Sequence, residues 1–288
     1  MKLRSLLARL PIERFRNPPP LVAVVTLGGV IGGVGPLRRG LSLTGLARTL
    51  ERAFTLHGVD AVALTINSPG GSAVQSALIH KRIRALADEH GVPVVAFVED
   101  VAASGGYWLA LAADEIHADD ASIVGSIGVV ASGFGLDKAI ERLGIERRLY
   151  TAGARKAMLD PFRAEDPADV AHLAELQGDI HETFKELVRA RRGKRLVGDQ
   201  DELFSGAFWT GRRALEHGLI DGIGELRGVM RARFGEAVRF KRIGEPRQWW
   251  RPRLGRLGDP AAGAAPADWA SSVIGAIEER LWWSRYGL

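Results

Sequence analysis

Residues 99–114 read Glu-Asp-Val-Ala-Ala-Ser-Gly-Gly-Tyr-Trp-Leu-Ala-Leu-Ala-Ala-Asp, and a strand-to-helix transition lies within them. An apolar, β-branched run at 92–98 comes before, and the alanine- and leucine-rich half after Ser104 has helical character. The stretch therefore predicts a strand, a sharp turn at Ser104-Gly105-Gly106 and a helix N-terminus. Such a turn exposes a hydroxyl beside free backbone N–H groups, which suits a nucleophile next to an oxyanion-binding site.

The same three residues also allow a purely structural interpretation. Serine is a favoured N-cap residue, and the two glycines could simply turn the chain. The motif does not match the Gly-x-Ser-x-Gly elbow of the α/β-hydrolases, because Ala102 stands at the first glycine position. Taken alone, the turn at Ser104 leaves both the nucleophile and the N-cap interpretations open.

The flanking sequence alternates between strand and helix signals. Ahead of the turn the pattern predicts strands at 22–27, 60–67 and 92–98 and helices at 46–56 and 73–89, with the turn Ser68-Pro69-Gly70-Gly71-Ser72 between. After it we expect strands at 115–118, 127–130 and 146–150, and helices at 134–143, 166–192 and 214–221, the last ending at Gly218. This order predicts an α/β fold of right-handed βαβ units with a parallel sheet, whose ligands bind at the carboxyl ends of the strands. Both glycine turns lie there.

Composition narrows the chemistry. The chain has 288 residues, 46% of them hydrophobic, a net charge of +5 and no cysteine, which excludes disulfides, thiolate metal sites and a cysteine nucleophile. No motif for a metal or a cofactor stands in a suitable context, so we expect neither. The basic cluster at 191–195 fits a helix C-terminus better than a nucleic-acid site, because no aromatic residues are interleaved with it.

Three regions follow from these patterns. Residues 1–20 are a basic amphipathic extension with a proline linker, residues 21–242 form the compact domain, and residues 243–288 are a tail with an amphipathic helix that holds five of the seven tryptophans. We find no transmembrane segment and no signal peptide, and we expect a cytoplasmic protein that can touch the membrane peripherally through its amphipathic ends.

A serine nucleophile needs a base. The seven histidines lack an acidic partner at a recognisable spacing, so a lysine is the alternative. Lys156 is the best candidate, because it lies in a loop with apolar neighbours rather than on a charged helix. A lysine works as a base only where its surroundings keep the amine uncharged, and Ser126 could orient that amine by a hydrogen bond.

Five motifs, taken together and in order, resemble the signal peptide peptidase family of the SppA/SohB type. They are Asn67-Ser68-Pro69-Gly70-Gly71, Ala103-Ser104-Gly105-Gly106-Tyr107, Gly125-Ser126-Ile127-Gly128-Val129, the 153–156 loop, and Thr210-Gly211 with Ala214 and Gly218-Leu219-Ile220-Asp221. The resemblance covers about residues 21–240, and the separation of Ser104 from Lys156 agrees with the short members. Many members have an N-terminal membrane anchor, which this sequence does not show.

The resemblance implies a ClpP/crotonase-like spiral fold and a serine endopeptidase with a Ser–Lys dyad. Ser104 would be the nucleophile, Lys156 the general base and Ser126 the residue that holds the lysine, while the N–H groups of Gly71 and Gly105 would form the oxyanion hole. It also implies a homo-oligomeric ring in which neighbouring subunits share each site, and substrates that are signal-peptide remnants or other unfolded, membrane-derived peptides.

Three other activities compete with this one. A crotonase-like acyl-CoA enzyme uses similar glycine turns but has no reason for a Ser-Gly-Gly nucleophile with a loop lysine. A ClpP-like His–Asp mechanism finds Val129 rather than histidine at the corresponding place. A non-catalytic, membrane-associated scaffold that binds peptides is suggested by the two amphipathic ends, although both dyad residues are present.

Overall fold

The computed structural model describes residues 18–33, 40–244 and 280–288. Within them one eight-stranded sheet has the order β6-β5-β3-β2-β1-β8, with β4 beside β3 and β7 beside β4. The strands are β1 (Leu21–Gly28), β2 (Ala61–Ser68), β3 (Val94–Ala103), β4 (Glu115–Ala118), β5 (Ile123–Gly125), β6 (Phe208–Thr210), β7 (Gly222–Ile223) and β8 (Arg239–Arg242). Only the β5–β6 pair among them is antiparallel. The expected parallel sheet of βαβ units is therefore confirmed.

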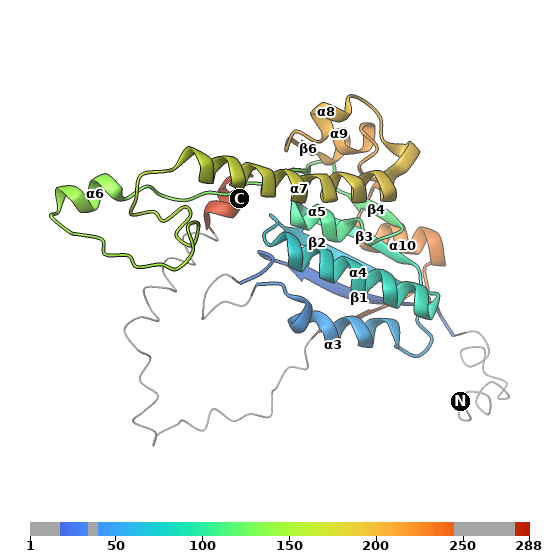
Figure 1. The fold of residues 1–288 in the computed structure, drawn as a ribbon. Coiled ribbons are helices and arrows are strands. Elements are labelled where there is room, and N and C mark those ends of the chain that lie inside the picture. The colour runs from blue at the N-terminus through green and yellow to red at the C-terminus, as the bar shows by residue number, and fades with distance from the viewer. Residues whose placement is uncertain (1–17, 34–39, 245–279) are drawn as a thin grey trace, which may run out of the picture.

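Helices cover both faces of the sheet (Figure 1). The helices of the described residues are α3 (Leu43–Phe54), α4 (Ala73–His90), α5 (Gly105–Ala110), α6 (Asp137–Arg142), α7 (Pro167–Arg192), the 3-10 turn η1 (Gly193–Arg195), α8 (Gln200–Leu203), α9 (Gly211–Glu216) and α10 (Leu226–Phe234). Helices α3, α4 and α5 pack on one face and α10 on the other. The predicted helices at 46–56, 73–89 and 166–192 thus correspond to α3, α4 and α7.

The two faces divide each central strand between two hydrophobic clusters. On β1, Ala23 and Val25 belong to the larger cluster under α3, α4 and α5, while Val22 and Val24 belong to the smaller one with Met230 of α10. This period of two is what a strand covered on both sides requires. The continuous apolar run of the sequence is therefore explained by burial on both faces.

Local signals begin and end the helices where the sequence places them. The Ser72 side chain accepts a hydrogen bond from the N–H of Gln75 at the start of α4, and Gly91 ends that helix at a φ of 62°. Asp166 caps α7 in the same way, ahead of Pro167. Gly218 follows α9 at a φ of 72°, as predicted.

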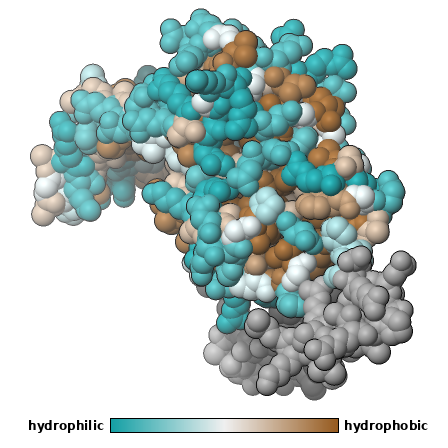
Figure 2. All heavy atoms as spheres, turned by 90° about the vertical axis from the view of Figure 1, so that its right-hand side faces the viewer, coloured by the Kyte–Doolittle hydropathy of each residue, from teal (hydrophilic) through white to brown (hydrophobic). Residues whose placement is uncertain are grey.

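Residues 129–166 form an arm that projects from the body of the molecule and carries α6 (Figure 1). None of the six residues of α6 is buried. Large apolar side chains are nevertheless frequent on the arm, and Phe134 and Tyr150 are 79% and 90% exposed. Figure 2 shows another face of the molecule, on which hydrophilic side chains alternate with apolar patches. The arm thus exposes several large apolar side chains among its charged ones, and no other described segment covers them.

Two predicted strands are wrong. Residues 127–130 lie just beyond β5, which ends earlier at Gly125, and residues 146–150 are irregular within the arm. Both segments carry β-branched or aromatic residues, but a strand also needs a neighbour with free backbone groups, and the arm stands away from the sheet. The short strand predicted at 115–118 is confirmed as β4, because β3 and β7 flank it.

Several predictions concern residues outside the described part of the chain. These are the basic helix within 1–15, residue 17 of the 17–20 linker, and the helix from about 268 up to residue 279. The proposed boundaries at 20 and 242, and peripheral membrane contact through the ends, stay predictions. Across residues 18–33, 40–244 and 280–288, no helix combines the length and apolarity needed to cross a bilayer.

Candidate active site

Ser104 lies where β3 passes into α5, at the carboxyl edge of the sheet. Its backbone has φ 52° and ψ −119°, a conformation that residues other than glycine rarely adopt. The N–H of Ser104 donates to the carbonyl oxygen of Gly125 at 2.8 Å, and its own carbonyl accepts from Trp108 at 3.0 Å. These two backbone bonds hold the strained turn between a neighbouring strand and the first turn of the helix.

The Ser104 side chain does not cap α5. Although the residue stands at the N-cap position, its hydroxyl makes no capping hydrogen bond with any described residue. A capping serine would usually have extended backbone and would bind an N–H of the first helical turn, as Ser72 does. The N-cap interpretation therefore fails, and the hydroxyl is left available for chemistry.

Glycines keep the space in front of Ser104 open. Gly70 and Gly71 have φ values of 108° and 138°, and a Cβ on Gly70 would come within 2.9 Å of the Ser104 Cβ. Hydrogen bonds between Ile31 and the residues on either side fix Gly71, with Ile31 N–H donating to Gly70 and Ser72 N–H donating to Ile31, both at 2.8 Å. Gly105 is the first residue of α5, so its N–H has no acceptor inside the helix. Both candidate oxyanion donors thus flank the hydroxyl.

A pocket of about 220 Å³ brings these groups together. Gly71, Ser104 and Gly105 line one side of it. The other lining residues are mainly apolar, and they are Ala73, Trp108, Gly128, Val129, Val130, Ile180, Phe184 and Trp282. The Trp108 and Phe184 rings stack with centroids 4.6 Å apart, which stiffens the apolar wall. The arrangement suits an apolar peptide side chain held beside the serine.

Ser126 lies close to this pocket but does not line it. It is mostly buried, has a φ of 53°, and its N–H donates to the carbonyl of Ala207 at 2.7 Å. It follows Gly125, whose carbonyl holds Ser104. The nearest side-chain partner of its hydroxyl is Tyr286, whose own hydroxyl lies 3.4 Å away. The structure thus places Ser126 one residue from the contact that orients the predicted nucleophile.

Lys156 is not brought to Ser104 within a single chain. It lies in a turn of the projecting arm, where its N–H donates to Gly153 at 3.2 Å, and its side chain is exposed. It is not among the residues that line the 220 Å³ pocket. Of the five predicted site residues, Gly71, Ser104 and Gly105 share that pocket, Ser126 stands beside it, and Lys156 stands apart.

No histidine lines the pocket among the described residues. His80 is buried between α4 and its neighbours, where burial and then the charge of Arg191 lower its pKa to about 4. His181 lies nearer the site, but its Nε2 is 3.1 Å from the carbonyl oxygen of Ile127 and is engaged there. The expectation that histidine is not the base agrees with both placements.

The sequence reasoning missed the apolar wall of the pocket. Ile180 and Phe184 come from one face of α7, and their four-residue spacing was a usable signal because Val188 continues it into the core. Trp282 and Tyr286 carried no such signal. Their tail was expected to meet a membrane, a partner or its own domain, without a defined place.

The last of the five motifs has a structural role. Asp221 receives two hydrogen bonds from the Arg192 guanidinium at 2.8 and 3.0 Å, and a third from Arg195 at 2.7 Å. Burial alone would raise the pKa of Asp221, but these hydrogen bonds and one from the N–H of Ile116 hold it below its usual range. The buried Tyr107 hydroxyl donates to the carbonyl of Leu219 nearby. This network ties α5, α7 and β4 together behind the pocket.

Comparison with known proteins identifies the family. Residues 87–236, which include Ser104, Ser126 and Lys156, match the model of peptidase family S49. The chain belongs to peptidase family S49. Within that family its resemblance to the SppA/SohB-type peptidases is supported by chloroplastic serine protease SPPA of Arabidopsis thaliana, which is 33% identical over 71% of this chain and 31% of its own length.

A second relative carries a different name. A protein of Brucella abortus called Na(+)/H(+) antiporter NhaA is 47% identical over 99% of this chain, which corresponds to 39% of that protein. This chain therefore spans less than two fifths of the length of both relatives. The S49 match covers this chain's own residues, and the antiporter name belongs to the longer protein.

The fold is also found among solved structures. A mutant of the 1510-N membrane-bound stomatin-specific protease superposes with a TM-score of 0.50, at 16% identity, over 80% of this chain and all of that one. At this identity the likeness concerns the fold alone. It confirms the ClpP/crotonase-like α/β fold predicted for this S49 chain.

Proposed function

We propose that this S49 chain is a serine endopeptidase whose nucleophile is Ser104 and whose general base is Lys156. The observation that carries the proposal is the uncapped hydroxyl of Ser104, held at a strained φ in an apolar pocket beside Gly71 and Gly105. A strained residue of this kind costs about 1–3 kcal/mol, which the surrounding structure must offset. Strain without a capping role favours a chemical role for the side chain.

Lys156 would reach Ser104 from a neighbouring copy in a homo-oligomeric ring. The lysine is exposed on an arm whose large apolar side chains, among them Phe134, Leu143 and Tyr150, are also exposed among the described residues. Packing such an arm on a second copy would bury its apolar surface and remove water from the amine. The same contact would thus supply the base and keep it uncharged.

The chemistry then follows from the placement of these groups. The uncharged Lys156 amine accepts the proton of the Ser104 hydroxyl while Oγ attacks the carbonyl carbon of the peptide bond. The N–H groups of Gly71 and Gly105 bind the oxyanion that forms. Lys156, held by Ser126, returns the proton to the leaving amine. Water deprotonated by the same lysine hydrolyses the acyl-enzyme and restores Ser104.

The pocket supports peptides with apolar side chains as substrates. Its wall beside Ser104 is built from Trp108, Ile180 and Phe184, and an extended peptide would place a side chain there. Signal-peptide remnants and other unfolded, membrane-derived peptides have this character. We therefore propose them as the substrate class, in keeping with the peptidase names of the relatives.

Labelling and complementation test the dyad. A fluorophosphonate probe should label wild-type protein at Ser104, and Ser104→Ala, Lys156→Ala and Lys156→Arg should each abolish peptide hydrolysis, since guanidinium is no base near neutral pH. Lys138→Ala, an exposed lysine of the same arm, is the matched control and should keep activity. Mixing the Ser104→Ala and Lys156→Ala proteins should restore part of the activity if copies share sites.

Three results would refute this function. If the Ser104→Ala or the Lys156→Ala variant hydrolysed peptides at the wild-type rate, Ser104 and Lys156 would not be the catalytic dyad. Tight acyl-CoA binding without labelling of Ser104 would favour a crotonase-like enzyme, and peptide binding without turnover would favour a non-catalytic scaffold.

A further inference from the structure

Residues 280–288 lie against the catalytic edge of the sheet, although their sequence predicted no contact there. Trp282 lines the 220 Å³ pocket together with Ser104 and Gly105. Four residues later, the Tyr286 hydroxyl lies 3.4 Å from Ser126 Oγ and 3.5 Å from the carbonyl oxygen of Pro69. The segment therefore touches both the proposed substrate pocket and the residue proposed to hold the lysine.

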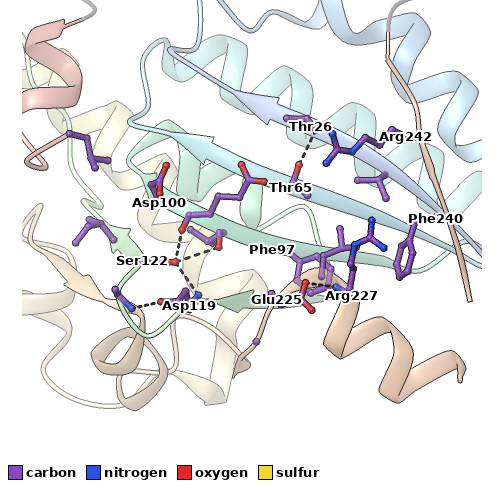
Figure 3. Close-up of a pocket in the computed structure, with 18 of the residues that line it drawn as sticks. Thr26, Thr65, Phe97, Asp100, Asp119, Ser122, Glu225, Arg227, Phe240 and Arg242 are labelled. Carbon is purple, nitrogen blue, oxygen red and sulfur yellow. Dashed lines mark hydrogen bonds between the residues drawn. The ribbon is translucent and has the colours of Figure 1, made fainter. Parts of the chain in front are cut away.

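The same segment continues into a second, larger cavity. This groove of about 1040 Å³ lies on the sheet face that α10 covers only in part, and Tyr286 and Leu288 line it. Figure 3 shows its floor, where Thr65 bonds Thr26, with Asp100 and Ser122 toward one side and Arg227 and Arg242 toward the other. Residues 282–288 thus run from the pocket beside Ser104 to the open groove.

The contacts that seat this segment are few and weak. The two Tyr286 hydroxyl distances are long for O–H···O hydrogen bonds, which are usually 2.5–3.0 Å. The firmest contact is the edge-to-face packing of Tyr286 on Phe208, with centroids 5.1 Å apart. Arg285 stacks on Trp282, but both residues belong to the segment, so this contact does not hold the segment against the rest of the protein. A segment held by two aromatic side chains can leave without disturbing the core.

We propose that residues 280–288 are a built-in, displaceable occupant of the peptide-binding groove, and that they compete there with aromatic and apolar peptides. Trp282 takes the place of a substrate side chain, and Tyr286 takes the position beside Ser126 that the incoming Lys156 amine needs. The segment therefore suppresses activity until substrate or a neighbouring copy displaces it. This inference rests on the proposed peptidase function and adds to it an aromatic preference in the pocket.

Point variants of the full chain test the occupancy. Trp282→Ala and Tyr286→Ala should each raise kcat/KM for an apolar peptide, and the double variant should raise it about tenfold, which corresponds to a seated segment in about nine of ten wild-type chains. The rate of fluorophosphonate labelling of Ser104 should rise in parallel. Leu281→Ala is the matched control, because Leu281 is 54% exposed and lines neither cavity, and it should leave both rates unchanged.

A peptide added in trans provides a second readout. The synthetic peptide Arg-Leu-Trp-Trp-Ser-Arg-Tyr-Gly-Leu should inhibit the double variant competitively or be cleaved by it. The same peptide with alanine in place of the residues matching Trp282 and Tyr286 should do neither. Unchanged or reduced rates in the variants, or equal effects of the two peptides, would overturn the occupancy. Labelling that persists in Ser104→Ala would instead overturn the proposed nucleophile, so the two failures are distinguishable.

Discussion

At the scale of single residues, the site depends on backbone conformations rather than on side-chain hydrogen bonds. Ser104 and Ser126 both have positive φ values, although neither is a glycine. Gly125 links them, because its carbonyl accepts from the N–H of Ser104 and Ser126 is the next residue in the chain. Conformations of this kind persist only where the surroundings impose them. Here the imposing contacts are the main-chain bonds to Gly125 and Ala207, and the space that Gly70 leaves open.

Gly70→Ala should disable the site without unfolding the chain. An alanine Cβ would lie 2.9 Å from the Ser104 Cβ and 3.0 Å from the Gly105 nitrogen, so the proposed nucleophile and one proposed oxyanion donor must both shift. We expect kcat/KM to fall by about 100-fold, the usual loss for a displaced oxyanion donor. Peptide hydrolysis and labelling of Ser104 measure it.

Gly29→Ala is the matched control for this change. Gly29 also has a positive φ, of 98°, but a Cβ there would meet nothing within 4 Å. It carries the backbone strain without the clash, so it should lower stability and keep most of the activity. Equal activity losses in the two variants would show that strain, and not the position of Ser104, decides the result.

The sequence predicted which residues to look at, and part of their arrangement, but not their geometry. Serine and two glycines after a strand indicate an exposed hydroxyl, and the structure places Ser104, Gly71 and Gly105 together. The φ of Ser126 follows from a bond to Ala207, which is far along the chain, so no local pattern encodes it. The position of Trp282 at the pocket depends on tertiary contacts for the same reason.

At the scale of elements, α7 is the helix that joins the pocket to the rest of the domain. Its middle supplies Ile180 and Phe184 to the pocket, and its last residue, Arg192, is buried in the ion pair with Asp221. Periodicity predicted this helix to within a residue at its N-terminus, because Asp166 and Pro167 are strong start signals. Hydrophobic periodicity does not indicate which distant residue a side chain contacts, so only the structure shows the buried Arg192–Asp221 pair.

Asp221→Asn should destabilise the protein strongly. Arg192 is 3% exposed, and the substitution leaves its charge without a counter-charge, which typically costs about 3–5 kcal/mol. Because the folded pKa of Asp221 lies below its ordinary value, the contribution is complete above about pH 4 and is lost as the pH falls through the folded pKa. Urea unfolding of wild type and variant across acid pH should show both effects.

The control for this ion pair is an exposed one. Asp120→Asn breaks the contact with Arg212, in which both side chains are more than half exposed, and it should change stability by less than about 1 kcal/mol. Similar losses in the two variants would mean that burial does not set the value of the Asp221 pair.

At the scale of the whole molecule, the arm and the body have opposite surfaces. The body buries its apolar residues in two clusters on either side of the sheet, whereas the arm exposes Phe134, Leu143 and Tyr150. The strand predicted at 146–150 was wrong because this segment, although it ends in Leu149 and Tyr150, pairs with no strand among the described residues. Contact with a second copy, as proposed above, would give these side chains a partner.

Replacing Phe134 and Tyr150 together by aspartate should dissociate the assembly. The change places charge on an apolar contact surface, while both side chains are exposed in the single chain, so the fold should remain intact. Native mass spectrometry should then report single copies, and peptide hydrolysis should be lost. Val197→Asp, an exposed apolar position on the body, is the control and should preserve both. An active single-copy variant would contradict sites shared between copies.

Lys156 lies on the arm and not in the pocket beside Ser104. If it acts there from a second copy, activity depends on the concentration of the protein. A newly made molecule would meet the many nascent and partly folded chains around it while still incomplete. In the proposed assembly each active site needs two molecules to meet, so peptidase activity would rise more steeply than protein concentration. A low concentration of the protein would by itself protect nascent chains from cleavage, without any separate inhibitor.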